Sequence, residues 1–474
     1  MKYQTILLFV LLGLGLNTYS QNNINQKSAR EAPEWISHGV MYQIWPRSFT
    51  VEGTLSAATK KLPEIAELGA TIVYVCPVML QDRDINRDFW SPRQQASPAS
   101  NPRNPYRIMD YTKVDPEYGT DEDLKEIIKT AHYLGLRVLM DLVYLHTGPS
   151  NVLIQNPEYY KRDEKGNFIK NHWNFYDLNY GNRELREFLL NTVEEWIRKY
   201  DFDGWRCDVS ARIPVDFWEE ARRRMGKIKP DIGMLAESNA PDEQLEAFDV
   251  SYGTPWFHGL KNVIANGEPA GELRKSWEFL NNGFPRGARF IRFVDNHDQF
   301  RPEIVFSKKG SMAANVLNFT IDGVPFIYNG QEIGDASPYG IMYYPEKSYN
   351  DNGAINWNAQ FIPHQKELRN WYKRLIALRK SENALLEGET LWLKTDNPES
   401  AVAFLRKTDN ETIIVVVNVS NRKIKVNVEL QDVTGNKEIK PKALFFSGKD
   451  EITRLNGKNV TLSLGSFGYY VGKF

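Results

Sequence analysis

The stretch Gly204-Trp205-Arg206-Cys207-Asp208-Val209 is a short β-type run that carries an arginine and an aspartate two residues apart. Residues i and i+2 of a strand share a face, so Arg206 and Asp208 are expected to point toward one ligand. Three further apolar runs carry acids in the same way. They are Asp141 to His146, Leu235 to Ser238, and Val294 to Asp298. This repetition indicates a sheet whose strands deliver acids to one edge.

Short β-branched runs alternate with longer amphipathic runs from Val40 onward. Eight such strands with interleaved helices predict a closed parallel (β/α)8 TIM barrel over residues 35–382, because parallel strands need crossovers and closure removes the sheet edges. An open doubly wound sheet is the alternative. The predicted strands are Met41–Trp45, Thr71–Cys76, Arg137–Val143, Gly204–Val209, Gly233–Glu237, Val250–Tyr252, Phe290–Val294 and Pro325–Tyr328.

Two long insertions interrupt this alternation. One runs from Leu80 to about Asn104, and the other, about 147–182, forms a short inserted B region after the third strand. Both leave from strand carboxyl ends, where barrels build their active sites, so we expect both to be functional. After Ser381 alternating strands predict a C-terminal antiparallel β-sandwich over residues 383–474.

Composition and charge limit the classes of partner. With 59 basic and 60 acidic side chains, the chain carries a formal charge of −1, which favours neither nucleic acid nor anionic lipid as a partner. Aromatic residues make up 12% of the chain, which suits stacking against uncharged sugar rings. We therefore expect a neutral carbohydrate ligand.

The first 20 residues have the pattern of a secretory signal peptide. An apolar run from Ile6 to Leu16 follows Lys2 and is too short to span a membrane. We expect export to the periplasm or the medium, with no membrane span in the mature chain. Cys76 and Cys207 both lie in strand-like runs and are expected to be buried free thiols.

Placing the acid-bearing runs on strands three, four, five and seven brings seven side chains to one barrel mouth. Three close acids around a neutral ligand favour glycoside hydrolysis, which needs one ionised carboxylate and one protonated carboxyl. We expect Arg206 to keep Asp208 ionised, and repulsion between the acids to keep a proton on Glu237. A metal site is the alternative, but a fixed cation among the acids opposes a second one, so no metal or other cofactor is expected. The seven residues are Asp141, His146, Arg206, Asp208, Glu237, His297 and Asp298.

In their order along the chain, these runs resemble the α-amylase family of retaining glycoside hydrolases. The runs Met41 to Phe49 and Gly323 to Glu332 are similar to that family's first- and eighth-strand signatures. The resemblance implies Asp208 as nucleophile, Glu237 as general acid/base and Asp298 as the third acid, which binds and distorts the sugar. It also implies a set of substrate-binding residues, with Tyr106 stacking on the sugar at the cleavage point: Tyr106, His146, Arg206, His297 and Arg301.

Within this family the run around Val209 looks most like neopullulanase and cyclomaltodextrinase members, in which a valine after the nucleophile is associated with α-1,6 bonds. Two positions depart from the family pattern. Leu145 replaces an asparagine that commonly binds a structural calcium, and an aliphatic side chain cannot ligate a hard cation, so this calcium site is expected to be absent. Arg107 replaces an aspartate that pairs with the equivalent of Arg301 in exo-acting α-glucosidases, which opens the question of a modified terminal sugar.

The expected function is hydrolysis of α-1,4 or α-1,6 bonds in maltodextrin- or isomalto-type oligosaccharides. A transglycosylase using the same glycosyl-enzyme intermediate is the second hypothesis. A non-catalytic carbohydrate-binding protein on the same fold is the third, and the intact Asp208, Glu237 and Asp298 argue against it. Linkage preference, endo or exo action and oligomeric state stay open.

Overall fold

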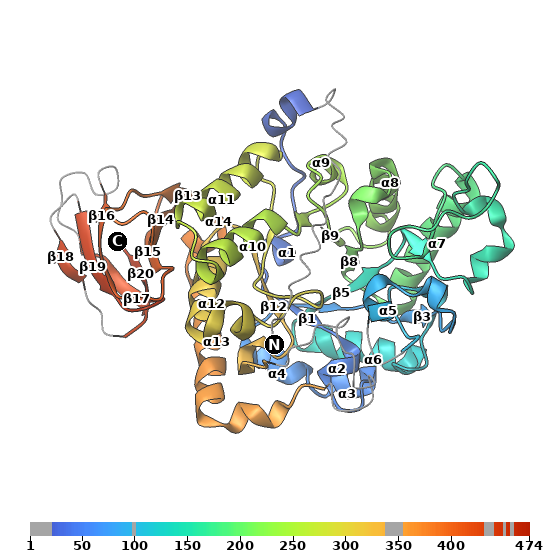
Figure 1. Ribbon diagram of the computed structural model, residues 1–474, viewed down its shortest axis with the longest axis horizontal. Coiled ribbons are helices and arrows are strands. Elements are labelled where there is room, and N and C mark those ends of the chain that lie inside the picture. The colour runs from blue at the N-terminus through green and yellow to red at the C-terminus, as the bar shows by residue number, and fades with distance from the viewer. Residues whose placement is uncertain (1–20, 97–100, 337–353, 431–439, 449–451, 456–458) are drawn as a thin grey trace, which may run out of the picture.

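The computed structural model describes residues 21–96, 101–336, 354–430, 440–448, 452–455 and 459–474 (Figure 1). Its central sheet has eight parallel strands in the order β10-β9-β8-β5-β2-β1-β12-β11. A parallel bridge between Ser251 and Phe290 joins the two end strands and closes the sheet. The predicted (β/α)8 barrel is therefore confirmed, and the open sheet is excluded. The strands are β1 (Met41–Ile44), β2 (Ile72–Val75), β5 (Arg137–Leu142), β8 (Gly204–Cys207), β9 (Gly233–Ala236), β10 (Val250–Ser251), β11 (Ile291–Arg292) and β12 (Val324–Tyr328).

The helices between these strands lie on the outside of the barrel (Figure 1). Thr120 and Asp123 form a reciprocal capping box at the start of α6 (Asp121–Tyr133). A long helix, α7 (Arg183–Tyr200), follows the second insertion. The other helices are α1 (Glu34–Ser37), α2 (Pro46–Phe49), α3 (Leu55–Thr59), α4 (Leu62–Leu68), α8 (Val215–Gly226), α9 (Glu243–Glu246), α10 (Thr254–Leu260), α11 (Gly271–Gly283), α12 (Pro302–Thr320), α13 (Pro363–Ser381) and α14 (Asn383–Glu387).

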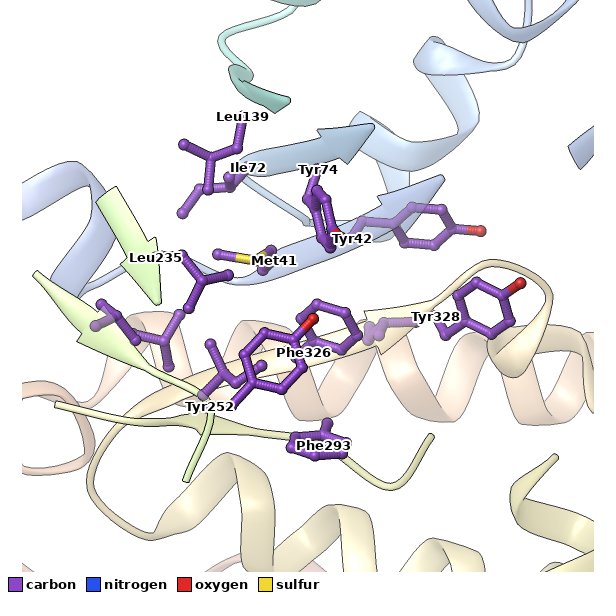
Figure 2. Close-up of a cluster of buried hydrophobic side chains, with 14 of the residues drawn as sticks. Met41, Tyr42, Ile72, Tyr74, Leu139, Leu235, Tyr252, Phe293, Phe326 and Tyr328 are labelled. Atoms are coloured by element: carbon purple, nitrogen blue, oxygen red, sulfur yellow. The ribbon is translucent and has the colours of Figure 1, made fainter. Parts of the chain in front are cut away.

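Large apolar side chains from several strands fill the barrel interior (Figure 2). Met41, Ile72, Leu139 and Leu235 come from β1, β2, β5 and β9, and each is fully buried. At one point two strands approach too closely for side chains. A methyl group on Gly204 would lie 2.0 Å from the carbonyl oxygen of Gly233, its partner across β8 and β9. Glycine at this point lets the acid-bearing strand β8 pack tightly against β9.

The two insertions pack against each other beside the barrel. The first contains β3 (Met79–Gln81) and α5 (Pro92–Ala96) and returns through β4 (Ile108–Val114), which pairs with β3. The second begins at β6 (His146–Thr147), which pairs with β7 (Tyr176–Asp177). Asn174 Nδ2 donates to the carbonyl oxygen of Trp90 at 2.8 Å, and the rings of Phe89 and Tyr176 are 5.3 Å apart. The insertions therefore form one joint wall.

Two antiparallel sheets form the C-terminal region, which confirms the predicted β-sandwich. Side chains from both sheets, such as Leu405 and Val426, meet in a core of their own. One sheet has the order β13 (Glu389–Trp392), β14 (Ala401–Lys407), β15 (Thr412–Asn418), β20 (Tyr469–Lys473) and β17 (Lys442–Phe446). The other has the order β16 (Ile424–Glu429), β19 (Asn459–Leu464) and β18 (Ile452–Leu455).

The predicted signal peptide, residues 1–20, lies outside the described residues. Within the described part of the chain, no helix has both the length and the apolar character needed to cross a bilayer. Cys76 and Cys207 are buried and unpaired, which confirms that prediction.

Candidate active site

The guanidinium of Arg206 lies at the centre of the barrel mouth and is completely buried. Its Nη1 donates to Asp141 Oδ1 and to Asp208 Oδ1, each at 2.7 Å, and its Nη2 forms an ion pair with Glu237 Oε2 at 2.8 Å. Asp141 and Arg206 are register partners on β5 and β8, and Asp208 and Glu237 directly follow β8 and β9. Three acids from neighbouring strands therefore share one cation.

Charge balance in this group requires a proton. One guanidinium cannot neutralise three carboxylates, and the surroundings are buried, so the fully ionised state is costly. Asp141 accepts hydrogen bonds from Arg206, Tyr106 and Tyr74, as an ionised carboxylate does. Asp208 and Glu237 therefore compete for the remaining hydrogen-bonding capacity of the guanidinium.

Asp208 differs from the expectation that Arg206 keeps it ionised. Burial raises the pKa of its carboxyl well above the usual range, and the neighbouring charge of Glu237 adds to this, whereas Arg206 opposes it. Asp208 is only 6% exposed, and Arg206 is shared with two other acids. Because the charge of Arg206 is shared by three acids, it does not offset the effect of burial on the pKa of Asp208.

Val209 has a backbone conformation that β-branched residues avoid. Its φ and ψ are both 44°, in the left-handed region, directly after Asp208. In this conformation the Val209 N–H donates to Glu237 Oε2 at 3.0 Å. Such strain costs about 1–3 kcal/mol and persists only where the surrounding structure imposes it. Here it links the turn after β8 to the acid on β9.

Asp298 is held by a residue that the sequence interpretation missed. Its Oδ1 accepts from Arg93 Nη1 at 2.8 Å, and its Oδ2 lies 3.2 Å from His297 Nε2. Burial alone would raise the pKa of Asp298, but His297, Arg93 and Arg206 outweigh it and lower the pKa. Arg93 belongs to α5 in the first insertion, so this insertion reaches the site.

A chain of hydrogen bonds connects Asp298 to the acids around Arg206. Gln43 Nε2 donates to His297 Nδ1 at 2.7 Å, which leaves the proton of the neutral ring on Nε2. That nitrogen lies 2.7 Å from the Tyr106 hydroxyl, which donates in turn to Asp141 Oδ2 at 2.8 Å. The Tyr106 ring stacks on His297, with centroids 5.3 Å apart and planes at 6°. Tyr106 and His297 are therefore fixed at the mouth.

His146 is neutral and supports Tyr106 from the other side. Its Nε2 donates to the carbonyl oxygen of Tyr106 at 3.0 Å, and its Nδ1 accepts from Asn171 at 3.2 Å. Burial lowers the pKa of His146 to about 3. The rings of Trp173 and Phe175 pack against it, so the second insertion also reaches the site.

Known protein families resemble both the barrel and the C-terminal region of this chain. The family model described as α-amylase, catalytic domain, matches residues 43–174, and the model described as maltogenic amylase, C-terminal domain, matches residues 392–471. The chain therefore has the catalytic domain of an α-amylase-family glycoside hydrolase, followed by a maltogenic-amylase C-terminal domain.

Several relatives match most of the chain. A maltogenic α-amylase of Bacillus acidopullulyticus is 28% identical over 454 residues, which cover 85% of this chain and 72% of the relative. A cyclomaltodextrinase of a Bacillus species is 26% identical over 437 residues, which cover 83% of this chain and 75% of the relative. The crystal structure of a maltogenic α-amylase from Thermotoga neapolitana, 26% identical, superposes with a TM-score of 0.77 over 93% of this chain and 99% of that one.

Arg301, also predicted to bind substrate, makes its hydrogen bonds and ion pairs away from the acids that Arg206 contacts. It is 1% exposed, and its Nη1 pairs with Asp295 Oδ2 at 3.0 Å. Nε and Nη2 donate to the carbonyl oxygens of Asp335 and Asn329. These contacts tie the turn after β11 to the turn after β12, which indicates a structural role for Arg301.

Arg107, at the position where exo-acting family members carry an aspartate, is buried in the first insertion. Its guanidinium donates to the carbonyl oxygens of four residues of that insertion and is not exposed. The structure thus removes Arg107 as a reason to expect a modified or charged sugar. The four acceptors are Asp82, Asp84, Phe89 and Pro102.

Leu145, at the family's calcium-binding position, is buried in the hydrophobic core. In the described part of the chain, no group of three or more His, Cys, Asp or Glu side chains is arranged to hold a metal ion. The absence of this calcium site stays a prediction.

Proposed function

We propose that this enzyme hydrolyses α-glucosidic bonds in maltodextrin- or isomalto-type oligosaccharides with retention, through a covalent glycosyl intermediate on Asp208. Glu237 protonates the leaving oxygen and then deprotonates the attacking water, while Asp298 binds and distorts the sugar. One observation carries this proposal. Arg206 touches both Asp208 and Glu237, so the proposed nucleophile and acid lie within the span of a single guanidinium.

The closeness of Asp208 and Glu237 suits this chemistry. Retaining hydrolysis needs one ionised and one protonated carboxyl at the same time. Two negative charges this close to each other repel, which favours a proton on one carboxyl of the reacting pair. In the proposed reaction this proton resides on Glu237 when a glycosidic oxygen approaches. The oxygen accepts the proton as its bond to the sugar breaks and Asp208 attacks.

The surroundings favour oligosaccharide substrates. The joint wall that the two insertions form reaches the mouth through Arg93 and Trp173. Tyr106 and His297, both nearly buried, offer an aromatic edge and a polar edge to a sugar ring. Relatives of similar sequence carry the names maltogenic α-amylase and cyclomaltodextrinase, which also points to maltose-based oligosaccharides.

Replacing Asp208 with asparagine tests the nucleophile. We expect Asp208→Asn to lower kcat on maltotriose by at least about three orders of magnitude, because the amide cannot attack the anomeric carbon. Thermal unfolding of the variant should stay cooperative. The matched control is Asp163→Asn, which changes a fully exposed carboxylate in the second insertion. Activity in Asp208→Asn within tenfold of the parent enzyme rejects the assignment.

Product analysis separates hydrolysis from the second hypothesis, transglycosylation. At high concentrations of maltose, isomaltose and panose, transfer produces longer or rearranged oligosaccharides, whereas hydrolysis produces only shorter ones. The same panel reports whether α-1,6 bonds are cleaved, as the valine after Asp208 suggests by resemblance.

We also propose that the protein is exported, with residues 1–20 removed. The support is the sequence pattern of a basic start and a short apolar run. N-terminal sequencing of the protein recovered from cell fractions tests this, and an intact Met1 on cytoplasmic protein contradicts it.

A further inference from the structure

A cavity lies at the junction between barrel helix α11 and the C-terminal strands β13 and β14. Its volume is about 570 Å³, which exceeds the volume of a disaccharide. Figure 1 shows β13 beside α11. Two tryptophans contribute to its walls, Trp277 from α11 and Trp392 from β13, and both are half-buried. Their ring centroids are 5.9 Å apart, with planes at 63°.

Trp277 is held in place by a network beneath the cavity. Its Nε1 donates to Asp322 Oδ2 at 2.6 Å, and the hydroxyl of Thr390 donates to the same oxygen at 3.1 Å. Arg292, completely buried, donates from Nε to the carbonyl oxygen of Asp322 at 2.8 Å. The indole is therefore oriented before any ligand arrives, which lowers the entropy cost of stacking against it.

Trp392 is an unusual choice for a purely structural position. Its ring packs on Phe404 at 5.7 Å, a contact that a phenyl ring could also make. Its Nε1 is buried and has no hydrogen-bond acceptor among the described residues, and an unsatisfied buried donor destabilises the fold. Packing alone would favour phenylalanine here. An indole offers a larger flat face to a ligand.

Polar side chains of both signs surround the two indoles. Three are basic and two are acidic, and Arg274 Nε donates to Glu278 Oε1 at 2.8 Å. A nearly balanced rim with many donors and acceptors suits a neutral polyhydroxylated ligand better than an ion. The rim residues are Arg274, Glu278, Lys394, Lys407 and Glu429.

We propose that this cavity is a second carbohydrate-binding site, which holds an α-glucan chain by stacking on Trp277 and Trp392 while the barrel mouth acts on another part of the chain. The choice of α-glucan as ligand rests on the proposed function, whereas the binding site rests on the cavity. Its effect is to raise the local concentration of long substrates near the enzyme. Short substrates, which cannot reach both sites, gain nothing.

A covalent block tests the site without disturbing the fold. Cys76 and Cys207 are buried, so a cysteine at the exposed Lys394 is the one accessible thiol in the described part of the chain. Lys394→Cys is combined with Asp208→Asn, and maltoheptaose binding is measured by calorimetry before and after labelling with fluorescein maleimide. The matched control carries Tyr133→Cys, on the 89% exposed end of α6, and the same label.

The stoichiometry distinguishes failure of this site from failure of the proposed function. A fall from two bound chains to one on labelling at position 394 supports both. A fall from one to none supports the second site and leaves the barrel mouth without affinity for this sugar, which counts against the proposed function. An unchanged stoichiometry overturns the second site.

Activity provides an independent readout. With Asp208 intact, labelling at position 394 should raise KM for soluble starch about threefold to tenfold, which corresponds to the loss of aromatic stacking. The kcat/KM for maltotriose should stay constant. Equal effects on both substrates, or none on starch, contradict the proposal.

Discussion

Two charge clusters in this molecule have opposite compositions. At the barrel mouth one guanidinium, Arg206, serves three carboxylates. At the end of α12 one carboxylate, Asp322, is surrounded by three buried arginines: Arg292, Arg379 and Arg406. The first cluster has excess negative charge and the second has excess positive charge.

The two clusters balance their excess in different ways. Arg379 donates to the carbonyl oxygens of Phe319 and Ile321, and Arg406 donates to those of Thr320 and Gly388. The carbonyl end of a helix carries partial negative charge, so α12 compensates the arginines permanently. At the mouth the backbone contributes the N–H of Val209 to Glu237, and we infer that a proton balances the remaining negative charge. A cluster balanced by backbone dipoles stabilises the fold, whereas one balanced by a proton can perform chemistry.

The largest expected effect follows from replacing the shared cation. In Arg206→Lys an ammonium cannot reach Asp208 and Glu237 together as the planar guanidinium does. We expect kcat to fall by about 100- to 1000-fold, the cost of removing a major electrostatic contact from a catalytic site. Steady-state kinetics on maltotriose measures this. A near-normal kcat in the folded variant contradicts the contrast between the two clusters, because catalysis at the mouth would then not depend on one guanidinium shared by three acids.

Asp322→Asn should affect stability and leave chemistry alone. Removing the single carboxylate leaves three buried cations and weakens the anchor of Trp277, so we expect a loss of about 2–4 kcal/mol in the free energy of unfolding. Asp322 keeps 31% side-chain exposure, which limits the cost. Denaturant unfolding measures the loss, and Asp163→Asn controls for a generic Asp-to-Asn change. A drop in kcat of the folded variant contradicts the assignment of the Asp322 cluster to stability alone.

Glu243 extends the comparison to a single buried acid, whose protonation is governed by burial. Burial raises its pKa to about 7, above the unfolded value near 4.5. Its contribution to stability is therefore complete below pH 4.5 and is lost as the pH rises through 7. Glu243→Gln, which needs no proton, should gain on the order of 2 kcal/mol over the parent between pH 5 and pH 8. Parallel curves of unfolding free energy against pH contradict this.

The smallest effect is expected at the rim of the mouth. Arg93→Ala removes a cation that lowers the pKa of Asp298, so this pKa rises and activity is lost at a higher pH on the acid side. Arg93 is 40% exposed, and we expect kcat/KM to fall only about threefold to tenfold. The control is Arg87→Ala in the same insertion. A pH–rate profile identical to the parent shows that Arg93 does not act through Asp298.

The sequence predicted the parts of the site that lie on regular elements. Asp141, Arg206 and Asp208 occupy alternate positions of strands, and their chain order places them at one barrel mouth. Arg93 and Arg107 could not be assigned in this way, since both lie in an irregular insertion where spacing does not define direction. Arg107 turns inward to backbone carbonyls, whereas Arg93 reaches Asp298. The raised pKa of Asp208 was also not predicted from the sequence, because it depends on how three acids share one cation.

The position of Arg406 has a consequence for the chain as a whole. It belongs to β14 of the sandwich, yet it caps α12 of the barrel, so the two regions complete each other's polar groups. Cutting the chain after α14 would not release a smaller working enzyme. The remaining barrel would lose the bond from Arg406 to Thr320 at the end of α12 and would keep only the bonds from Arg379 there. Heating should therefore melt barrel and sandwich in a single step, and grafting a foreign C-terminal module would require an arginine at the same place.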